Sequence, residues 1–130
     1  MAIGEDQPEA VLPEAGPPAE FDDYTIVLLL RPPDAPDLAQ DELDKLQRQH
    51  LGHLETLRQK GVLLANGPFL EQPDQSWRGL AIYGVGVEEA RRLAEADPSV
   101  KRGRLKIIAF RWLTRKGALF SASAAPPSKA

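Results

Sequence analysis

The order of apolar and amphipathic segments between residues 21 and 115 most constrains the fold of this chain. Four short runs are rich in β-branched and other apolar residues, and two longer segments repeat their apolar residues at helical spacing. The runs cover residues 24–30, 62–65, 77–85 and 104–113, and the helical segments cover 37–60 and 87–97. This order, strand-helix-strand-strand-helix-strand, predicts an α+β, ferredoxin-like βαββαβ fold: a four-stranded antiparallel sheet with two helices on one face.

Proline, glycine and capping residues set the expected ends of these segments. Asp37, with Gln40 three residues later, has the spacing of a capping box, so the first helix is predicted to begin there. Gly61 suits the C-terminal cap of that helix. The second strand is expected to end in a turn at Asn66-Gly67-Pro68, and Pro98 to end the second helix.

Charge and proline divide the chain into a domain and two tails. Residues 1–23 hold seven of the 19 acidic residues, none of the 16 basic ones and four prolines. A segment so polar cannot bury enough surface to offset the entropy lost on ordering. We therefore expect residues 1–20 to be a disordered acidic tail, 21–115 the folded domain, and 116–130 a flexible C-terminal tail.

The scarcity of cysteine and histidine narrows the chemistry. The chain has no cysteine and two histidines, which excludes disulfides, thiol catalysis and a three-histidine metal site built from one chain. No cofactor motif is present, so neither a cofactor nor a metal is predicted. Since the sequence lacks a signal-peptide pattern and an apolar run of roughly 20 residues, we expect a cytoplasmic protein with no membrane partner.

Both faces of the predicted sheet are apolar. In the last strand, alternate residues point in opposite directions, with Leu105, Ile107 and Ala109 on one side and Ile108, Phe110 and Trp112 on the other. Two helices cover only one face of such a sheet, and the other would be a large exposed patch. A second copy packed sheet to sheet predicts a homodimer. The alternative cover, the N-terminal tail, is too polar to suffice alone.

Two polar residues fall on the apolar stripes of the helices. His50 lies between Leu43 and Leu57 on the first helix, whereas His53 lies at the edge of that stripe. The alternative for His50 is a core histidine bonded to a backbone carbonyl. Asp97 extends the stripe of the second helix at its C-terminal end, where the helix dipole disfavours a carboxylate. An ordinary Asp-Pro turn is the alternative there. Because both helices share one face of the sheet, the two side chains can meet.

A histidine and a carboxylate in contact can move protons near neutral pH, since the carboxylate fixes the imidazole tautomer. We therefore expect His50 to act as general base and then acid, with Asp97 as its orienting partner. The predicted function is a cofactor-independent lyase or isomerase acting on a small anionic or enolisable metabolite. The alternatives are a non-catalytic ligand-binding or scaffold dimer, in which the pair is structural, and a cofactor-free monooxygenase, for which the residues give no direct support.

Several motifs together resemble the YciI-like family. They are the runs at 50–54 (HLGHL) and 61–68 (GVLLANGP), then Arg78-Gly79, residues 88–90 (EEA) and Asp97-Pro98. The resemblance covers about residues 24–113 and implies ferredoxin-like subunits that dimerise through their sheets as dimeric α/β barrels. It also implies a histidine and an aspartate in a cleft between helices and sheet. Spacing to Gly67-Pro68 matches the histidine to His50 rather than His53.

The resemblance likewise matches the aspartate to Asp97, and one branch of the family eliminates chloride from a chlorinated ring compound. Many relatives carry arginine where this chain has Gln47, a departure that bears on the substrate. The candidates for substrate binding are Gly67, Pro68, Arg78 and Asp74.

Each remaining candidate has a simpler structural alternative. The segment 66–68 can offer backbone N–H groups to a substrate but is first a turn, Asp74 is a second acid or a solvated loop residue, and Tyr83 is typical of a core or interface. Residues 101–116 hold seven bases and no acid, which fits either an anion-binding surface or a solvated strand edge. The pI of 5.4 argues against a nucleic-acid partner.

Overall fold

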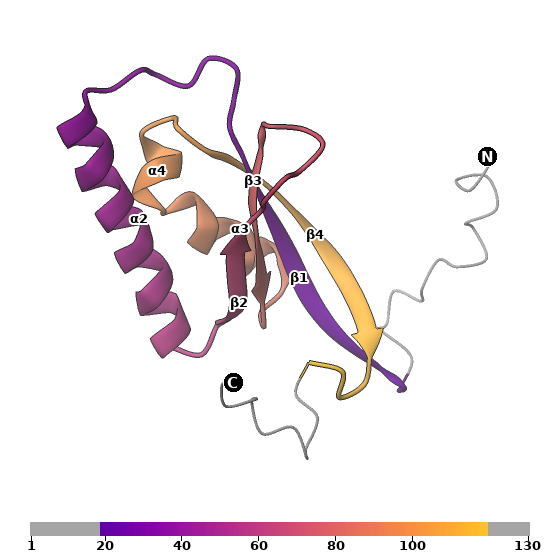
Figure 1. The fold of residues 1–130 in the computed structure, drawn as a ribbon. Coiled ribbons are helices and arrows are strands. Elements are labelled where there is room, and N and C mark those ends of the chain that lie inside the picture. The colour runs from indigo at the N-terminus through magenta and orange to yellow at the C-terminus, as the bar shows by residue number, and fades with distance from the viewer. Residues whose placement is uncertain (1–18, 120–130) are drawn as a thin grey trace, which may run out of the picture. The chain divides into compact units, whose positions relative to one another are not determined.

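A computed structural model describes residues 19–119 of the chain. They divide into a compact unit, Tyr24–Trp112, and a second unit formed by the two ends, of which 19–23 and 113–119 are described. The elements in chain order are β1 (Phe21–Leu30), α2 (Gln40–Gln59), β2 (Leu63–Pro68), β3 (Trp77–Tyr83), α3 (Val87–Glu95), α4 (Pro98–Lys101) and β4 (Lys106–Arg115) (Figure 1).

The strands form one open antiparallel sheet in the order β2-β3-β1-β4. This confirms the predicted α+β, ferredoxin-like fold. A barrel would need the sheet to close, and the four strands of this chain do not close. The short helix α4 is an addition that the sequence pattern did not predict.

The helices lie on one face of the sheet and enclose the core (Figure 1). Val27 of β1 and Tyr83 of β3 are buried against Leu54 and Leu57 of α2. The alanines of α3, Ala90 and Ala94, are also buried in this cluster, where their small side chains let the helix approach closely. Burial of such apolar area supplies the main stabilising free energy.

The opposite face of the sheet carries the second apolar set. Ile107 and Ala109 pack against the core, whereas Ile108 and Phe110, which alternate with them along β4, are 48% and 42% exposed. The predicted alternation of β4 is therefore confirmed. The strand itself lies two residues later than predicted, at Lys106–Arg115.

The segment Asn66-Gly67-Pro68, predicted to be a turn, instead completes β2. A register shift between Leu63 and Ala65 places Asn66 opposite Ala81, Gly67 opposite Leu80 and Pro68 opposite Gly79. The prediction of a turn was wrong because β2 is the edge strand, where a proline without an N–H group breaks no ladder.

Other boundaries shift by a few residues. The first helix begins at Gln40 with Ala39 at the N-cap, not at Asp37, and Glu42 Oε1 accepts a hydrogen bond from Ala39 N at 3.4 Å. Gly61 follows the helix at φ +81°, a left-handed conformation that favours glycine, as its predicted cap role requires. The third strand ends at Tyr83, two residues earlier than predicted.

The predicted tails, residues 1–20 and 116–130, lie outside the described residues except for 19–20 and 116–119. Within the second unit, Lys116 N donates to the Glu20 carbonyl at 2.8 Å. Asp22 accepts a hydrogen bond from Gly117 N at 2.8 Å and lies 3.7 Å from Lys116 Nζ. Within residues 19–119, no helix has the length and apolar content needed to cross a membrane.

Candidate active site

Asp97 does not lie at the C-terminal end of the second helix, where it was predicted. Helix α3 ends at Glu95, and Asp97 is the N-cap of α4, with Pro98 at the first helical position. Its Oδ1 accepts a hydrogen bond from Ser99 N at 2.8 Å. The expected conflict with a helix dipole does not arise, because an aspartate at an N-cap is favoured. The second helix ends at Glu95, two residues earlier than predicted, and Pro98 starts the new helix α4.

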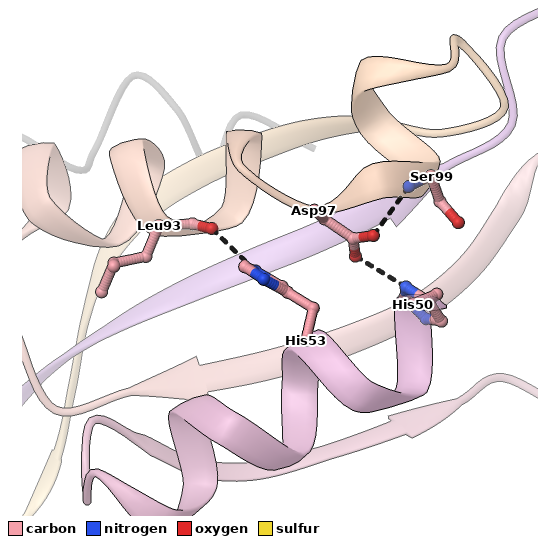
Figure 2. A network of polar contacts seen from close by, with 5 residues as sticks. All are labelled: His50, His53, Leu93, Asp97 and Ser99. Carbon is pink, nitrogen blue, oxygen red and sulfur yellow. Dashed lines mark hydrogen bonds and ion pairs between the residues drawn. The ribbon is translucent and has the colours of Figure 1, made fainter. Parts of the chain in front are cut away.

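His50 and Asp97 are in direct contact (Figure 2). His50 Nδ1 lies 2.6 Å from Asp97 Oδ2, and the two side chains are 12% and 2% exposed. A carboxylate accepts hydrogen bonds, so Nδ1 is the protonated nitrogen of the neutral ring. Since Asp97 Oδ1 is held by Ser99 N, the aspartate is fixed at both oxygens. The neutral imidazole is left with its lone pair on Nε2, the arrangement a general base needs.

His53 has the structural role that was the alternative for His50. Its Nε2 lies 2.9 Å from the carbonyl oxygen of Leu93 on α3 (Figure 2). A carbonyl only accepts, so His53 donates from Nε2 and ties α2 to α3. The structure thus separates two histidines one helical turn apart: one meets a carboxylate and the other a backbone carbonyl.

A cavity of about 470 Å³ lies between the N-terminal part of α2 and the sheet ends next to it. His50 lines it, whereas Asp97 is buried behind His50 and is absent from the lining. Leu43 and Leu46, in the N-terminal half of the apolar stripe of α2, line this cavity, while Leu57 packs in the core. A volume of this size suits a small metabolite.

The cavity brings together most of the predicted substrate-binding residues. Gly67, Pro68 and Arg78 line it. Asp74 lies outside the lining: its Oδ1 accepts hydrogen bonds from Ser76 N at 2.9 Å and Ser76 Oγ at 2.7 Å, which hold the β2–β3 loop. The Ser76 hydroxyl and N–H lower the pKa of Asp74, as expected for a carboxylate that accepts hydrogen bonds.

Tyr83 is buried beneath the site. Tyr83 is 1% exposed, and its side chain belongs to the core rather than to the cavity lining. Burial, together with the smaller effect of the negative charge of Asp97, raises the pKa of the Tyr83 hydroxyl to about 12. The hydroxyl therefore stays protonated beside the carboxylate that orients His50.

The profile of the YCII-related domain matches residues 25–112. The chain belongs to the YCII-related domain family. No curated protein matches it. Among solved structures, it is similar to 5-chloro-2-hydroxyhydroquinone dehydrochlorinase (TftG) from Burkholderia phenoliruptrix AC1100 in complex with 2,5-dihydroxybenzoquinone. That likeness has 24% sequence identity and a TM-score of 0.49, and covers 68% of this chain and 92% of that chain.

In this member of the YCII-related family, two arginines of the cavity were not among the predicted substrate-binding residues. Arg31 and Arg104 line the cavity with Arg78. Arg31 follows the last residue of β1, and Arg104 belongs to the basic run 101–116, for which an anion-binding surface and a solvated strand edge were the predicted alternatives. In an antiparallel sheet of this order, the chain end of β1 lies at the same end of the sheet as the starts of β3 and β4. The strand order of the predicted fold, taken together with the basic residues at the strand ends, is the signal that indicates them.

Proposed function

We propose that this protein is a cofactor-independent acid–base enzyme, of the lyase or isomerase type, that acts on a small anionic or enolisable metabolite. One observation carries the proposal: the ring nitrogen of His50 that faces Asp97 is committed to the carboxylate at 2.6 Å, while the same ring lines a cavity of about 470 Å³. An imidazole oriented from behind and open to a pocket in front is typical of a general base.

The proposed reaction starts with His50 as base. Nε2 takes a proton from a carbon next to a carbonyl group, and the electron pair of the broken C–H bond moves into an enolate. The imidazolium that forms is stabilised by the Asp97 carboxylate. In an isomerisation, Nε2 returns the proton to another atom of the enolate. In an elimination, the enolate electrons expel an anionic leaving group, and His50 later gives its proton to solvent.

The experiment follows carbon-bound hydrogen exchange in D₂O by proton NMR. A panel of enolisable carboxylates, pyruvate, oxaloacetate and 2-oxoglutarate, serves as the set of probes. We expect the full-length protein to exchange the hydrogens next to a carbonyl group of at least one probe above the buffer rate. His50→Gln should lower this exchange at least a hundredfold, since removing a general base costs about 10²–10⁴ in rate.

Two further variants test the roles within the pair. His53→Gln removes the other histidine of α2 and should keep the exchange rate. Asp97→Asn keeps an oxygen for Ser99 N but turns an amide donor toward His50, which moves the ring proton to Nε2. That variant should remain folded and lose most of its activity. If His50→Gln and Asp97→Asn lower only the melting temperature while exchange persists, the pair is structural and the proposal fails.

We also propose that the protein is a homodimer whose subunits meet through the sheet face opposite the helices. Ile108 and Phe110 of β4 are exposed on that face, and the half-buried Leu28 of β1 and Ile82 of β3 alternate with the core residues Val27 and Ala81. Large apolar side chains exposed on one face of a small sheet suit an interaction site. The same face on two copies gives a self-complementary contact, the commonest arrangement in homo-oligomers.

A further inference from the structure

Three arginines converge on the cavity that His50 lines. Arg31 comes from the end of β1, Arg78 from the start of β3 and Arg104 from the segment before β4. Because the strands are antiparallel, the end of β1 and the starts of β3 and β4 lie at the same end of the sheet, and this brings the three arginines together. Asp44 is the single carboxylate in the described lining, and it accepts a hydrogen bond from Gln40. Positive charge therefore exceeds negative charge in this cavity.

These arginines are held by backbone carbonyls rather than by carboxylates. Arg31 Nε donates to the carbonyl of Arg104 at 2.9 Å, and Arg104 Nη1 donates to the carbonyl of Pro36 at 2.8 Å. Arg78 Nη1 donates to the carbonyl of Gln75 at 3.2 Å. By contrast, Arg58, Arg91 and Arg92 on the helix surfaces all pair with a glutamate. Across residues 19–119, no ion pair involves an arginine of the cavity.

Most N–H groups of each cavity arginine remain able to donate to a bound ligand. A guanidinium carries five N–H groups in a planar fork, and among residues 19–119 each of the three arginines donates one of them to a carbonyl. The three positive charges also repel one another: burial and the like charges of Arg104 and Arg78 lower the pKa of Arg31. Like charges brought together without a counter-charge cost free energy, which an anion between them would offset.

We propose that Arg31, Arg78 and Arg104 form a carboxylate-binding subsite that anchors an acidic metabolite with its reacting carbon toward His50. Planar guanidinium forks match a carboxylate through paired hydrogen bonds. The same positive charge would stabilise the enolate as proton transfer proceeds. That the bound acid is a substrate rests on the proposed acid–base function, whereas its binding by the three arginines does not.

The test is isothermal titration calorimetry of the full chain at constant ionic strength, with malonate as the probe. Malonamide, its neutral diamide, is the matched control ligand, and inorganic phosphate is the second anion. We expect malonate to bind, malonamide to give no heat, and phosphate to bind at least tenfold more weakly than malonate. Equal binding of malonate and malonamide would overturn the subsite, and phosphate binding as tightly as malonate would overturn its preference for carboxylates.

Arginine variants assign the binding to the cluster. Arg104→Gln and Arg78→Gln should each weaken malonate binding at least tenfold, and Arg78 is exposed, so its variant is the safer one for folding. Arg92→Gln removes the same charge from the surface of α3, where Arg92 pairs with Glu89, and should leave malonate affinity unchanged. If Arg92→Gln weakens binding as much as Arg78→Gln, the effect is general electrostatics and the subsite is refuted.

The two proposals can fail separately. His50→Gln leaves the arginines in place, so it should bind malonate as tightly as the unchanged protein while losing hydrogen exchange. If malonate binding depends on the arginines but hydrogen exchange never exceeds the buffer rate, the subsite stands and the acid–base function falls. If exchange depends on His50 but malonate binding does not depend on the arginines, the subsite alone is wrong.

Discussion

At the scale of single residues, the partner of each side chain decides its role. His50 and His53 lie one turn apart on α2, yet one meets Asp97 and the other the carbonyl of Leu93. The carboxylate leaves the His50 ring able to accept and return a proton, while the carbonyl fixes His53 as a donor. Tyr83 adds a third buried polar group, whose hydroxyl is kept neutral by burial and by Asp97.

The raised pKa of Tyr83 predicts a loss of stability at high pH. In the unfolded chain a tyrosine ionises near pH 10, whereas folding raises the pKa of Tyr83 to about 12. The unfolded state therefore releases a proton first, so stability is intact below pH 10 and falls between pH 10 and 12. We expect a loss of about 1–2 kcal/mol, allowing for solvent screening.

Urea unfolding at pH 8 and pH 11.5 measures this effect. Tyr83→Phe lacks the ionisable hydroxyl and should lose less stability over the same interval, while the titration of lysines is common to both proteins. An equal loss in the two proteins would show that Tyr83 does not carry the effect.

At the scale of elements, the site depends on how strands and helices end. The register shift in β2 turns Asn66 toward the cavity, opposite the core residue Ala81. The break between α3 and α4 gives Asp97 a capping position from which it reaches His50. Both features occur at the junctions of regular structure, where one extra residue or one proline redirects a side chain.

The close contact of β2 and β3 predicts a difference between two glycines. A Cβ added at Gly79 would lie 2.9 Å from the carbonyl oxygen of Gly67, whereas one added at Gly67 meets nothing within 4 Å. Because the contacted atom is backbone, the strands must separate, and Gly79→Ala should cost about 1–3 kcal/mol of stability. Gly67→Ala should change stability by less than about 0.5 kcal/mol. Chemical denaturation measures both, and equal effects would contradict the close approach.

At the scale of the whole molecule, the helices lie on one face of the open sheet, and the opposite face carries exposed apolar residues. The proposed dimer buries that face, so a charge placed there should prevent association. Ile108→Asp or Phe110→Asp is expected to shift the sedimentation coefficient from that of a dimer to that of a monomer, because an unpaired charge in an interface is costly. Leu51→Gln, which alters an exposed leucine of α2, should leave the dimer intact. A monomeric unchanged protein, or dimeric Ile108→Asp and Phe110→Asp variants, would refute this interface.

The sequence alone determined the order of the elements and the alternation of the strands, because hydrophobic periodicity and the positions of glycine and proline act locally. It also singled out His50 and Asp97, since the helical spacing predicted both on apolar stripes, although Asp97 instead caps α4. Arg31 and Arg104 carry no such local signal, because only the strand order of the sheet brings the end of β1 and the start of β4 together.

Tertiary structure alone decided which atoms meet. Local patterns set the ends of the helices to within a few residues, but the extension of β2 through Pro68 follows from its place at the edge of the sheet. The N-cap role of Asp97 follows from the start of a new helix after Pro98. The 2.6 Å contact joins residues 47 positions apart, and such a distance depends on how α2 and the α3–α4 junction pack over the same core. No spacing along the chain contains that information.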